Sequence, residues 1–72
     1  MYVSLKFTDH AARRLVQRYL DELDIRRTIA FPDEVREEID GTTVSKKTLG
    51  MKHVTVAWHR DSRGNYIVHT IT

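Results

Sequence analysis

The chain has 72 residues, no cysteine and a formal net charge of +2. This length allows a single domain, over residues 1–72, with a small hydrophobic core. The lack of cysteine excludes disulfides and thiolate metal sites, and the apolar runs fall far short of the roughly 20 residues that span a bilayer. Because the amino-terminal residues also lack the pattern of a secretory signal, we expect a cytoplasmic protein without a membrane segment.

Charge is distributed unevenly along the chain. Residues 1–20 carry four Lys or Arg against one acid (+3), and residues 41–72 carry five against one (+4). Residues 21–40 carry three Arg against eight acids (−5). Folding could bring the two basic ends onto one surface, which would attract polyanions. A mixed-charge surface that only keeps the protein soluble would explain the same distribution.

The first elements predicted are a strand and an amphipathic helix. Residues 2–7 have apolar side chains at every second position, which predicts a half-buried strand. Thr8 or Asp9 can cap a helix over about residues 9–19. Its apolar side is predicted to comprise Ala11, Ala12, Leu15, Val16, Tyr19 and Leu20. The opposite, solvent-facing side is predicted to comprise His10, Arg13, Arg14, Gln17 and Arg18.

A second, shorter helix is predicted over about residues 22–30. Asp21 and Asp24 have the spacing of a capping pair, and Pro32 ends the helix because proline lacks an amide hydrogen and restricts the residue before it. The side chains expected in the core are Leu23 (or Leu20), Ile25, Ile29 and Phe31.

The remainder of the chain favours strands. β-Branched and aromatic residues dominate it, and residues 61–64 are typical of a hairpin loop. The predicted strands are 34–39, 43–49, 52–60 and 65–72. We therefore predict an α+β fold in the order β-α-α-β-β-β-β, with two helices packed on one face of a mainly antiparallel sheet and the other face open.

The first helix carries the clearest candidate site. His10, Arg14 and Arg18 are spaced four apart, so their side chains stack along one face, where like charges repel. Such a column is best explained by a bound anion, since arginine pairs well with phosphate and histidine can transfer protons near neutral pH. Arg13 and Gln17 beside it are candidate RNA contacts. A solvated helix face, neutralised by nearby acids, is the alternative.

Two lysines and three histidines are further candidates. Lys46 and Lys47 are adjacent on a predicted strand, so one of them must point to each face. The histidines could meet in a metal site, but the sequence has neither a His-x-His pair nor an associated carboxylate. We therefore predict no metal. The three histidines are His53, His59 and His69.

Trp58 and Tyr66 are the aromatic residues that could stack on nucleic-acid bases. Trp58 is in phase with Val54 and Val56 on the predicted strand, which favours a place in the core instead.

Several motifs together resemble a known family. They are Phe7-Thr8-Asp9-His10-x-x-x-Arg14-x-x-x-Arg18, Phe31-Pro32-Asp33-Glu34-Val35, a lysine-bearing strand and Val68-His69-Thr70-Ile71. Over nearly its whole length the chain resembles the small prokaryotic family called domain of unknown function 4258. It departs from the family pattern at Tyr19, where the family usually has glycine, and at His69, where the strand is usually apolar.

The resemblance implies a fold and an activity. That family is grouped with the barnase-like and RelE-like toxins and is similar to BrnT-type toxins, which cleave RNA without a metal and are often neutralised by a partner protein. The site residues that it implies are His10, Arg14, Arg18, Lys46 or Lys47, and Thr70, with no cofactor. Such a mechanism is chemically sufficient, because RNA supplies its own 2′-hydroxyl nucleophile and needs only proton transfer and cationic stabilisation.

Three hypotheses therefore stand at this stage. The first is a metal-independent endoribonuclease of toxin type, with RNA as substrate and an antitoxin protein as partner. The second is a non-catalytic module that binds RNA or an acidic protein through the same stripe, with His69 as a further contact. The third is a structural or oligomerisation domain, and a homodimer is plausible for so small a chain.

Overall fold

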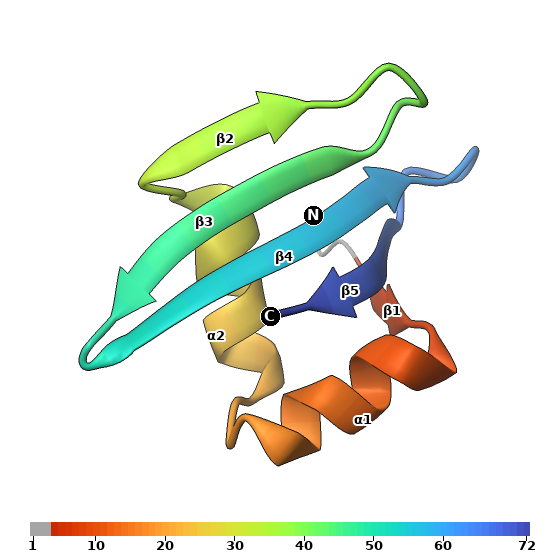
Figure 1. Ribbon diagram of the computed structural model, residues 1–72. Coiled ribbons are helices and arrows are strands. Elements are labelled where there is room, and N and C mark those ends of the chain that lie inside the picture. The colour runs from red at the N-terminus through yellow and green to blue at the C-terminus, as the bar shows by residue number, and fades with distance from the viewer. Residues whose placement is uncertain (1–3) are drawn as a thin grey trace.

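Five strands form one sheet in the order β1-β5-β4-β3-β2, as seen in a computed structural model that describes residues 4–72 (Figure 1). β1 runs parallel to β5, and the other neighbours are antiparallel. The strands are β1 (Leu5–Phe7), β2 (Glu34–Glu37), β3 (Thr43–Leu49), β4 (Lys52–Arg60) and β5 (Tyr66–Ile71). The predicted α+β order is confirmed. Residues 2 and 3 of the first predicted strand lie outside the described residues.

The two helices begin where the sequence predicts. In α1 (Asp9–Gln17) the Thr8 hydroxyl accepts a hydrogen bond from the Ala11 amide at 3.2 Å. α2 (Glu22–Ala30) opens with a complete capping box, in which Asp21 and Asp24 each accept the other's amide hydrogen. These bonds satisfy amides that the helix itself leaves without partners. Within residues 4–72, neither helix is long and apolar enough to cross a membrane.

α1 ends in a Schellman motif. The Leu20 amide donates to the Leu15 carbonyl at 3.0 Å, and the Tyr19 amide donates to the Val16 carbonyl at 3.1 Å. This motif requires a left-handed residue, which is usually glycine, and Tyr19 occupies that position with φ of 54°. The turn therefore places a tyrosine in a backbone conformation that disfavours residues with a Cβ.

The hydrophobic core lies between the helices and one face of the sheet. α2 passes behind β3 and β4, and no helix covers the face toward the viewer in Figure 1. Trp58 packs against the core from β4 and donates its indole hydrogen to the buried Ser45 hydroxyl at 2.9 Å, so its predicted place beside the core is confirmed. The buried core side chains are Ala11, Leu20, Ile25, Ile29, Val54, Val56, Val68 and Ile71.

Of the two alternatives predicted for the core, Leu23 and Leu20, only Leu20 is buried, and the prediction for Phe31 is wrong. Leu23 is 53% exposed and Phe31 is 72% exposed, whereas Thr28 is fully buried. Ile25, Thr28 and Ile29 share one side of the helix because they are three and four positions apart. The Thr28 hydroxyl donates to the Asp24 carbonyl at 2.9 Å, so it enters the core with its hydrogen-bonding need met.

The predicted division of α1 into two sides is also wrong in part. Val16 and Tyr19, both expected in the core, are 73% and 87% exposed, whereas Arg14 and Arg18 are only partly exposed. α1 runs along β5 at the margin of the sheet (Figure 1). Ala11 therefore faces the core while the two arginines reach the backbone of the sheet.

Candidate functional site

The face of the sheet that no helix covers is called the open face here. Val54 and Val56 point into the core, so Thr55 and Ala57 point to the open face. Thr70 is paired with Ala57 in register and therefore lies on the same face. A register shift at this point of the β4–β5 pairing allows both Val68 and Ile71 to be buried although they are three positions apart.

Hydrogen bonds from side chains of α1 and its caps fasten the helix to the margin of the sheet. The Thr8 hydroxyl donates to the His69 carbonyl at 3.0 Å, and Arg14 Nε donates to the Ile71 carbonyl at 3.1 Å. Arg18 Nη2 donates to the His53 carbonyl at 3.1 Å. β5 ends before it can pair with the first residues of β4, so the His53 carbonyl accepts a hydrogen bond from Arg18 instead of from a strand. The two guanidinium groups therefore have fixed positions beside the open face.

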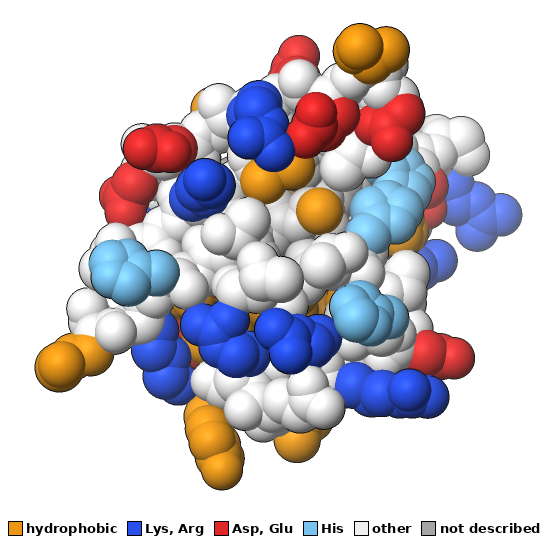
Figure 2. Space-filling model, viewed as in Figure 1, with side chains coloured by type: hydrophobic (Ala, Val, Ile, Leu, Met, Phe, Trp, Pro, Cys, Tyr) orange, Lys and Arg blue, Asp and Glu red, His pale blue; other side chains and the backbone are white. Residues whose placement is uncertain are grey.

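The charges of Arg14 and Arg18 are not neutralised within residues 4–72. The ion pairs in this part of the chain involve other cations, namely Arg26, Arg36 and Lys47. A carbonyl oxygen accepts a hydrogen bond without cancelling charge, and a guanidinium has five N–H donors. Figure 2 shows basic side chains and a histidine in a row over α1, below an uncharged band across the sheet. This arrangement can bind an anion, since both charge and free donors remain.

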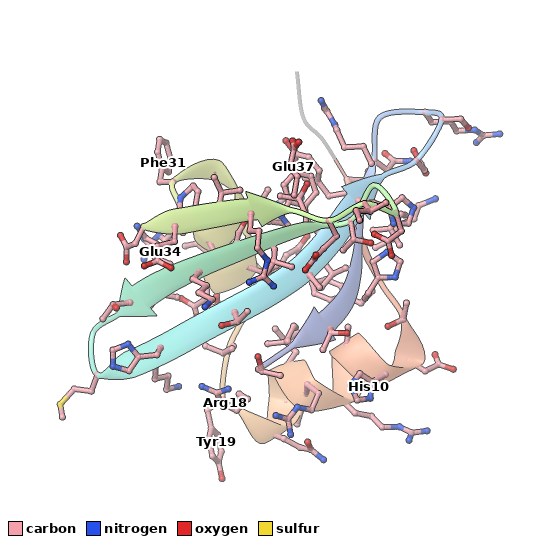
Figure 3. The ribbon with its side chains drawn as sticks, turned by 45° about the horizontal axis from the view of Figure 1, so that its top comes forward. His10, Arg18, Tyr19, Phe31, Glu34 and Glu37 are labelled. Carbon is pink, nitrogen blue, oxygen red and sulfur yellow. The ribbon has the colours of Figure 1, made fainter. Side chains whose placement is uncertain are left out.

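The other predicted residues of α1 divide between two sides of the helix. His10 lies in the first turn, exposed, one helical turn before Arg14, and Figure 3 shows it on the same helix as Arg18. Gln17 accepts a hydrogen bond from Arg14 Nη1 at 3.5 Å. Arg13 lies two residues after the buried Ala11, about 200° around the helix axis, and is exposed. Arg13 therefore points away from the core and into solvent.

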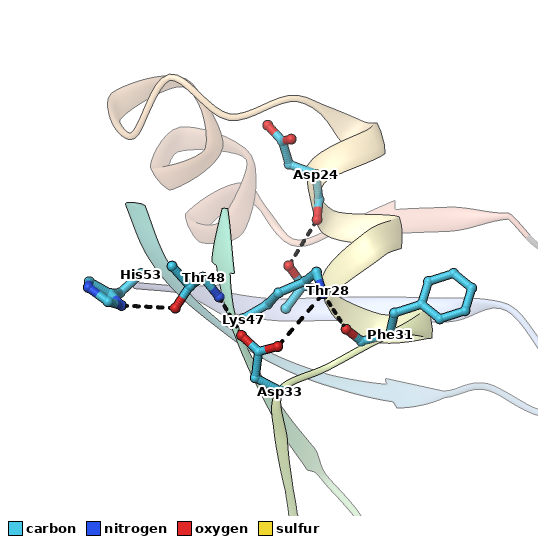
Figure 4. A network of polar contacts seen from close by, with 7 residues as sticks. All are labelled: Asp24, Thr28, Phe31, Asp33, Lys47, Thr48 and His53. Carbon is cyan, nitrogen blue, oxygen red and sulfur yellow. Dashed lines mark hydrogen bonds and ion pairs between the residues drawn. The ribbon is translucent and has the colours of Figure 1, made fainter. Parts of the chain in front are cut away.

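The two lysines point to opposite faces, as predicted, and the structure distinguishes them. Lys47 lies on the helix side, where its ammonium group donates to the Phe31 carbonyl at 2.7 Å and is 3.9 Å from Asp33 (Figure 4). Lys46 is exposed on the open face, opposite Glu34 in register. Of the two alternatives, Lys46 therefore shares a face with Thr70, and Lys47 does not.

A hollow of about 280 Å³ lies against β3, β4 and the start of β2. Its lining includes Lys46, Thr48, His53 and Thr55 together with the acids Asp33 and Glu34. His53 Nδ1 is 3.2 Å from the Thr48 hydroxyl. Hydrogen bonds in both directions join Thr55 to Thr72. Lys46 is paired with Thr55 in register, so Lys46, Thr55 and Thr72 form a polar row across the sheet. Thr72 directly follows Ile71, whose carbonyl accepts the hydrogen bond from Arg14. The sequence did not single out the threonines, because their common face depends on strand register.

Two of the three remaining histidines form a pair. His59 Nδ1 contacts His69 Nε2, and the two rings stack with centroids 4.5 Å apart. His53 lies at the opposite end of β4, beside Thr48. Within residues 4–72, no three His, Asp or Glu side chains are grouped so that they could hold a metal ion. The three histidines therefore do not converge on one point.

Comparison with known proteins gives one match. The sequence model of a family described as "Domain of unknown function (DUF4258)" matches residues 7–72, which include all of α1 and the sheet strands from β2 to β5. No curated protein and no solved structure matches the chain.

Proposed function

The chain belongs to the DUF4258 family, and we propose that it binds RNA on the open face and cleaves it without a metal, as a toxin-type endoribonuclease similar to RelE and BrnT. One observation carries the proposal. Arg14 and Arg18 are positioned by backbone carbonyls rather than by carboxylates, beside the face that carries Lys46 and Thr70. A protein that used these arginines only for stability would gain more from a carboxylate partner.

The proposed reaction uses the nucleophile that RNA already contains. The 2′-oxygen attacks the adjacent phosphorus as His10 removes its proton, and the bond to the 5′-oxygen of the next nucleotide breaks. The leaving 5′-oxygen takes up a proton from solvent water, so the products are a 2′,3′-cyclic phosphate and a 5′-hydroxyl. Arg14 and Arg18 stabilise the charge on the pentavalent phosphate. Thr70 donates a hydrogen bond to a phosphate oxygen.

The location and the partner belong to the same proposal. An RNA-cleaving toxin acts in the cytoplasm, where its substrate is, and needs a protein antitoxin that covers its site. The uneven charge suits such a partner, because an acidic segment would bind the same arginines as RNA.

The direct test is incubation of purified protein with mixed RNA in EDTA. Wild-type protein is expected to cleave, and the double variant His10→Ala, Arg14→Ala is expected to lose cleavage. Lys46→Gln and Lys47→Gln form a matched pair, since the lysines are adjacent but point to opposite faces. We expect Lys46→Gln to reduce cleavage and Lys47→Gln to leave it nearly unchanged. Intact RNA with wild-type protein would refute catalysis.

A pH profile tests the role of His10 separately. If His10 is the general base, cleavage falls when the assay pH is lowered from about 8 to about 5, because a protonated imidazole cannot accept the proton of the 2′-hydroxyl. A flat profile over this range would remove His10 from that role and leave the arginines as a binding site.

A second candidate function is RNA binding without cleavage. It is favoured by the surroundings of His10, which is exposed and has no hydrogen-bond partner within residues 4–72. A general base is normally held by a second group that fixes its ring, and no such group orients His10 here. Binding that persists in the absence of any cleavage would support this candidate over the enzyme.

A further inference from the structure

β2 is an edge strand that no other element covers. It is the last strand in the sheet order, all of its residues are exposed, and Figure 1 shows no helix or strand beyond it. Unpaired amide and carbonyl groups along such an edge can pair with another strand. Edge strands usually carry charges that prevent this pairing, so the order of the charges on β2 decides what it can bind.

The hydrogen-bonding pattern shows which residues of β2 face outward. The Glu38 amide donates to the Thr42 carbonyl at 2.8 Å. Bonded and non-bonded positions alternate in an antiparallel pair, so Glu34 and Arg36 also bond to β3. Val35 and Glu37 therefore direct their amide and carbonyl groups to the free side.

From this pattern we infer that β2 pairs with β2 of a second copy of the chain, antiparallel and with Val35 facing Val35 across a twofold axis. In this register Glu34 of each copy faces Arg36 of the other, which gives two pairs of opposite charge. Asp33 of each copy faces Glu37 of the other, but the Lys47 ammonium, 3.9 Å from Asp33, offsets this repulsion. Opposite charges directly across two strands stabilise their pairing.

Other registers are unfavourable. A shift of one residue would turn the bonding groups of one strand away from the other. A shift that centres the axis on Arg36 would place arginine against arginine and Glu34 against Glu38. One that centres it on Glu37 would form two Arg36–Glu38 pairs, but it would place Glu37 against Glu37 and Glu34 against Asp40 twice. The strand is therefore complementary to itself mainly in the register centred on Val35.

Exposed apolar residues flank this strand. Phe31 precedes β2 and Ile39 follows it, and both are exposed, as is Val35. Figure 3 shows Phe31 and Glu37 on one side of β2 and Glu34 on the other. In the inferred register the segment around Phe31 approaches the segment around Ile39 of the second copy. Apolar contacts would then lie at both ends of the interface, where β2 alone is too short to bury much surface.

The inferred dimer would join two five-stranded sheets into one. The twofold axis between antiparallel strands is perpendicular to the sheet, so the open faces of both copies lie on the same side. The inference does not depend on RNA binding, although it would extend any surface that binds a polyanion. The small contact implies weak association that depends on concentration.

Charge exchange tests the register. In Glu34→Arg and in Arg36→Glu, both intermolecular pairs change from attraction to repulsion, which we expect to weaken the dimer about tenfold or more in analytical ultracentrifugation. The double variant Glu34→Arg, Arg36→Glu restores opposite charges and should dimerise as wild type does. Each variant also alters a contact within its own chain: Glu34→Arg changes the residue opposite Lys46, and Arg36→Glu removes the ion pair with Glu38. The double variant retains these changes, so its recovery reports only the contact between copies.

A disulfide test gives an independent result. The chain has no cysteine, so Val35→Cys introduces a single thiol, which in this register lies about 5.5 Å, Cα to Cα, from its counterpart. Mild oxidation is expected to link Val35→Cys into dimers and to leave Ser62→Cys, in the exposed β4–β5 loop, monomeric. Wild-type protein that stays monomeric at about millimolar concentration, or a double variant that does not recover, would overturn the inference.

Discussion

The turn after α1 allows a stability prediction that depends on one backbone angle. Tyr19 has φ of 54°, a conformation that costs a residue with a Cβ about 1–2 kcal/mol and costs glycine almost nothing. Glycine also loses more conformational entropy on folding, about 0.5–1 kcal/mol. The difference between the midpoints of the two ranges favours Tyr19→Gly over Tyr19→Ala by about 0.75 kcal/mol.

Tyr19→Ala is the matched control because both variants lose the ring. The ring is 87% exposed and points away from the sheet in Figure 3, with the Lys52 ammonium 5.9 Å from its centroid. The hydrogen bonds of the turn involve only the backbone of Tyr19 and remain in both variants. The free energy of unfolding therefore differs between them only through the backbone.

Thermal unfolding followed by circular dichroism measures this difference. For a domain of this size, it corresponds to a melting temperature about 2–8 °C higher in Tyr19→Gly than in Tyr19→Ala. Equal melting temperatures, or a lower one for the glycine variant, would refute the assigned strain.

Three further predictions concern caps, buried polar groups and pH. Asp21→Ala removes half of the capping box and is expected to lower the free energy of unfolding by about 1 kcal/mol in urea titrations; no change would show that the box contributes nothing. Trp58→Phe leaves the buried Ser45 hydroxyl without its indole donor and should cost about 1–3 kcal/mol, part of which Ser45→Ala should restore in the double variant. Hydrogen bonds from the Asn65 amide, and then from its side chain and the Arg63 amide, hold the pKa of Asp61 below its ordinary value of 3.8. A carboxyl whose pKa is lower in the folded state stabilises the fold at pH values above its ordinary pKa, and this stabilisation is lost as pH falls through the folded pKa. The melting temperature of Asp61→Asn should therefore fall less than that of wild type between about pH 5 and pH 2.

Local signals in the sequence predict most of the fold. The capping residues Thr8 and Asp21 start the helices where they were expected, because a short polar side chain before an apolar-periodic segment has few other roles. β3 and β4 have the predicted bounds, since alternation and turn residues mark both ends of each strand. These features depend only on neighbours in the chain, which is why one sequence suffices to predict them.

The faces of the helices could not be predicted in the same way. The exposed positions of Val16 and Phe31 follow from where each helix sits on the sheet, which helical periodicity does not determine. Arg14 and Arg18 are drawn to the sheet by the carbonyls of Ile71 and His53. These acceptors are reached only because α1 lies at the sheet margin and, for His53, because β5 is shorter than β4.

The candidate site was likewise predictable only in part. The four-residue spacing of His10, Arg14 and Arg18 indicates a common stripe, and strand alternation separates Lys46 from Lys47. Which lysine joins the stripe depends on the register of β3 against β4 and on the face that α2 covers. Neither property is encoded by any short segment.

The availability of the two guanidinium groups for phosphate is measured most directly by the salt dependence of RNA binding. For single-stranded RNA, log K falls with log salt concentration by about 0.7 for each phosphate contact. Arg14→Gln, Arg18→Gln should therefore reduce the slope by about 1.4 relative to wild type, whereas Arg13→Gln, which points into solvent and is not held against the sheet, should leave it nearly unchanged. Equal slopes for wild type and the double variant, or an equal loss in Arg13→Gln, would contradict a phosphate site at these arginines.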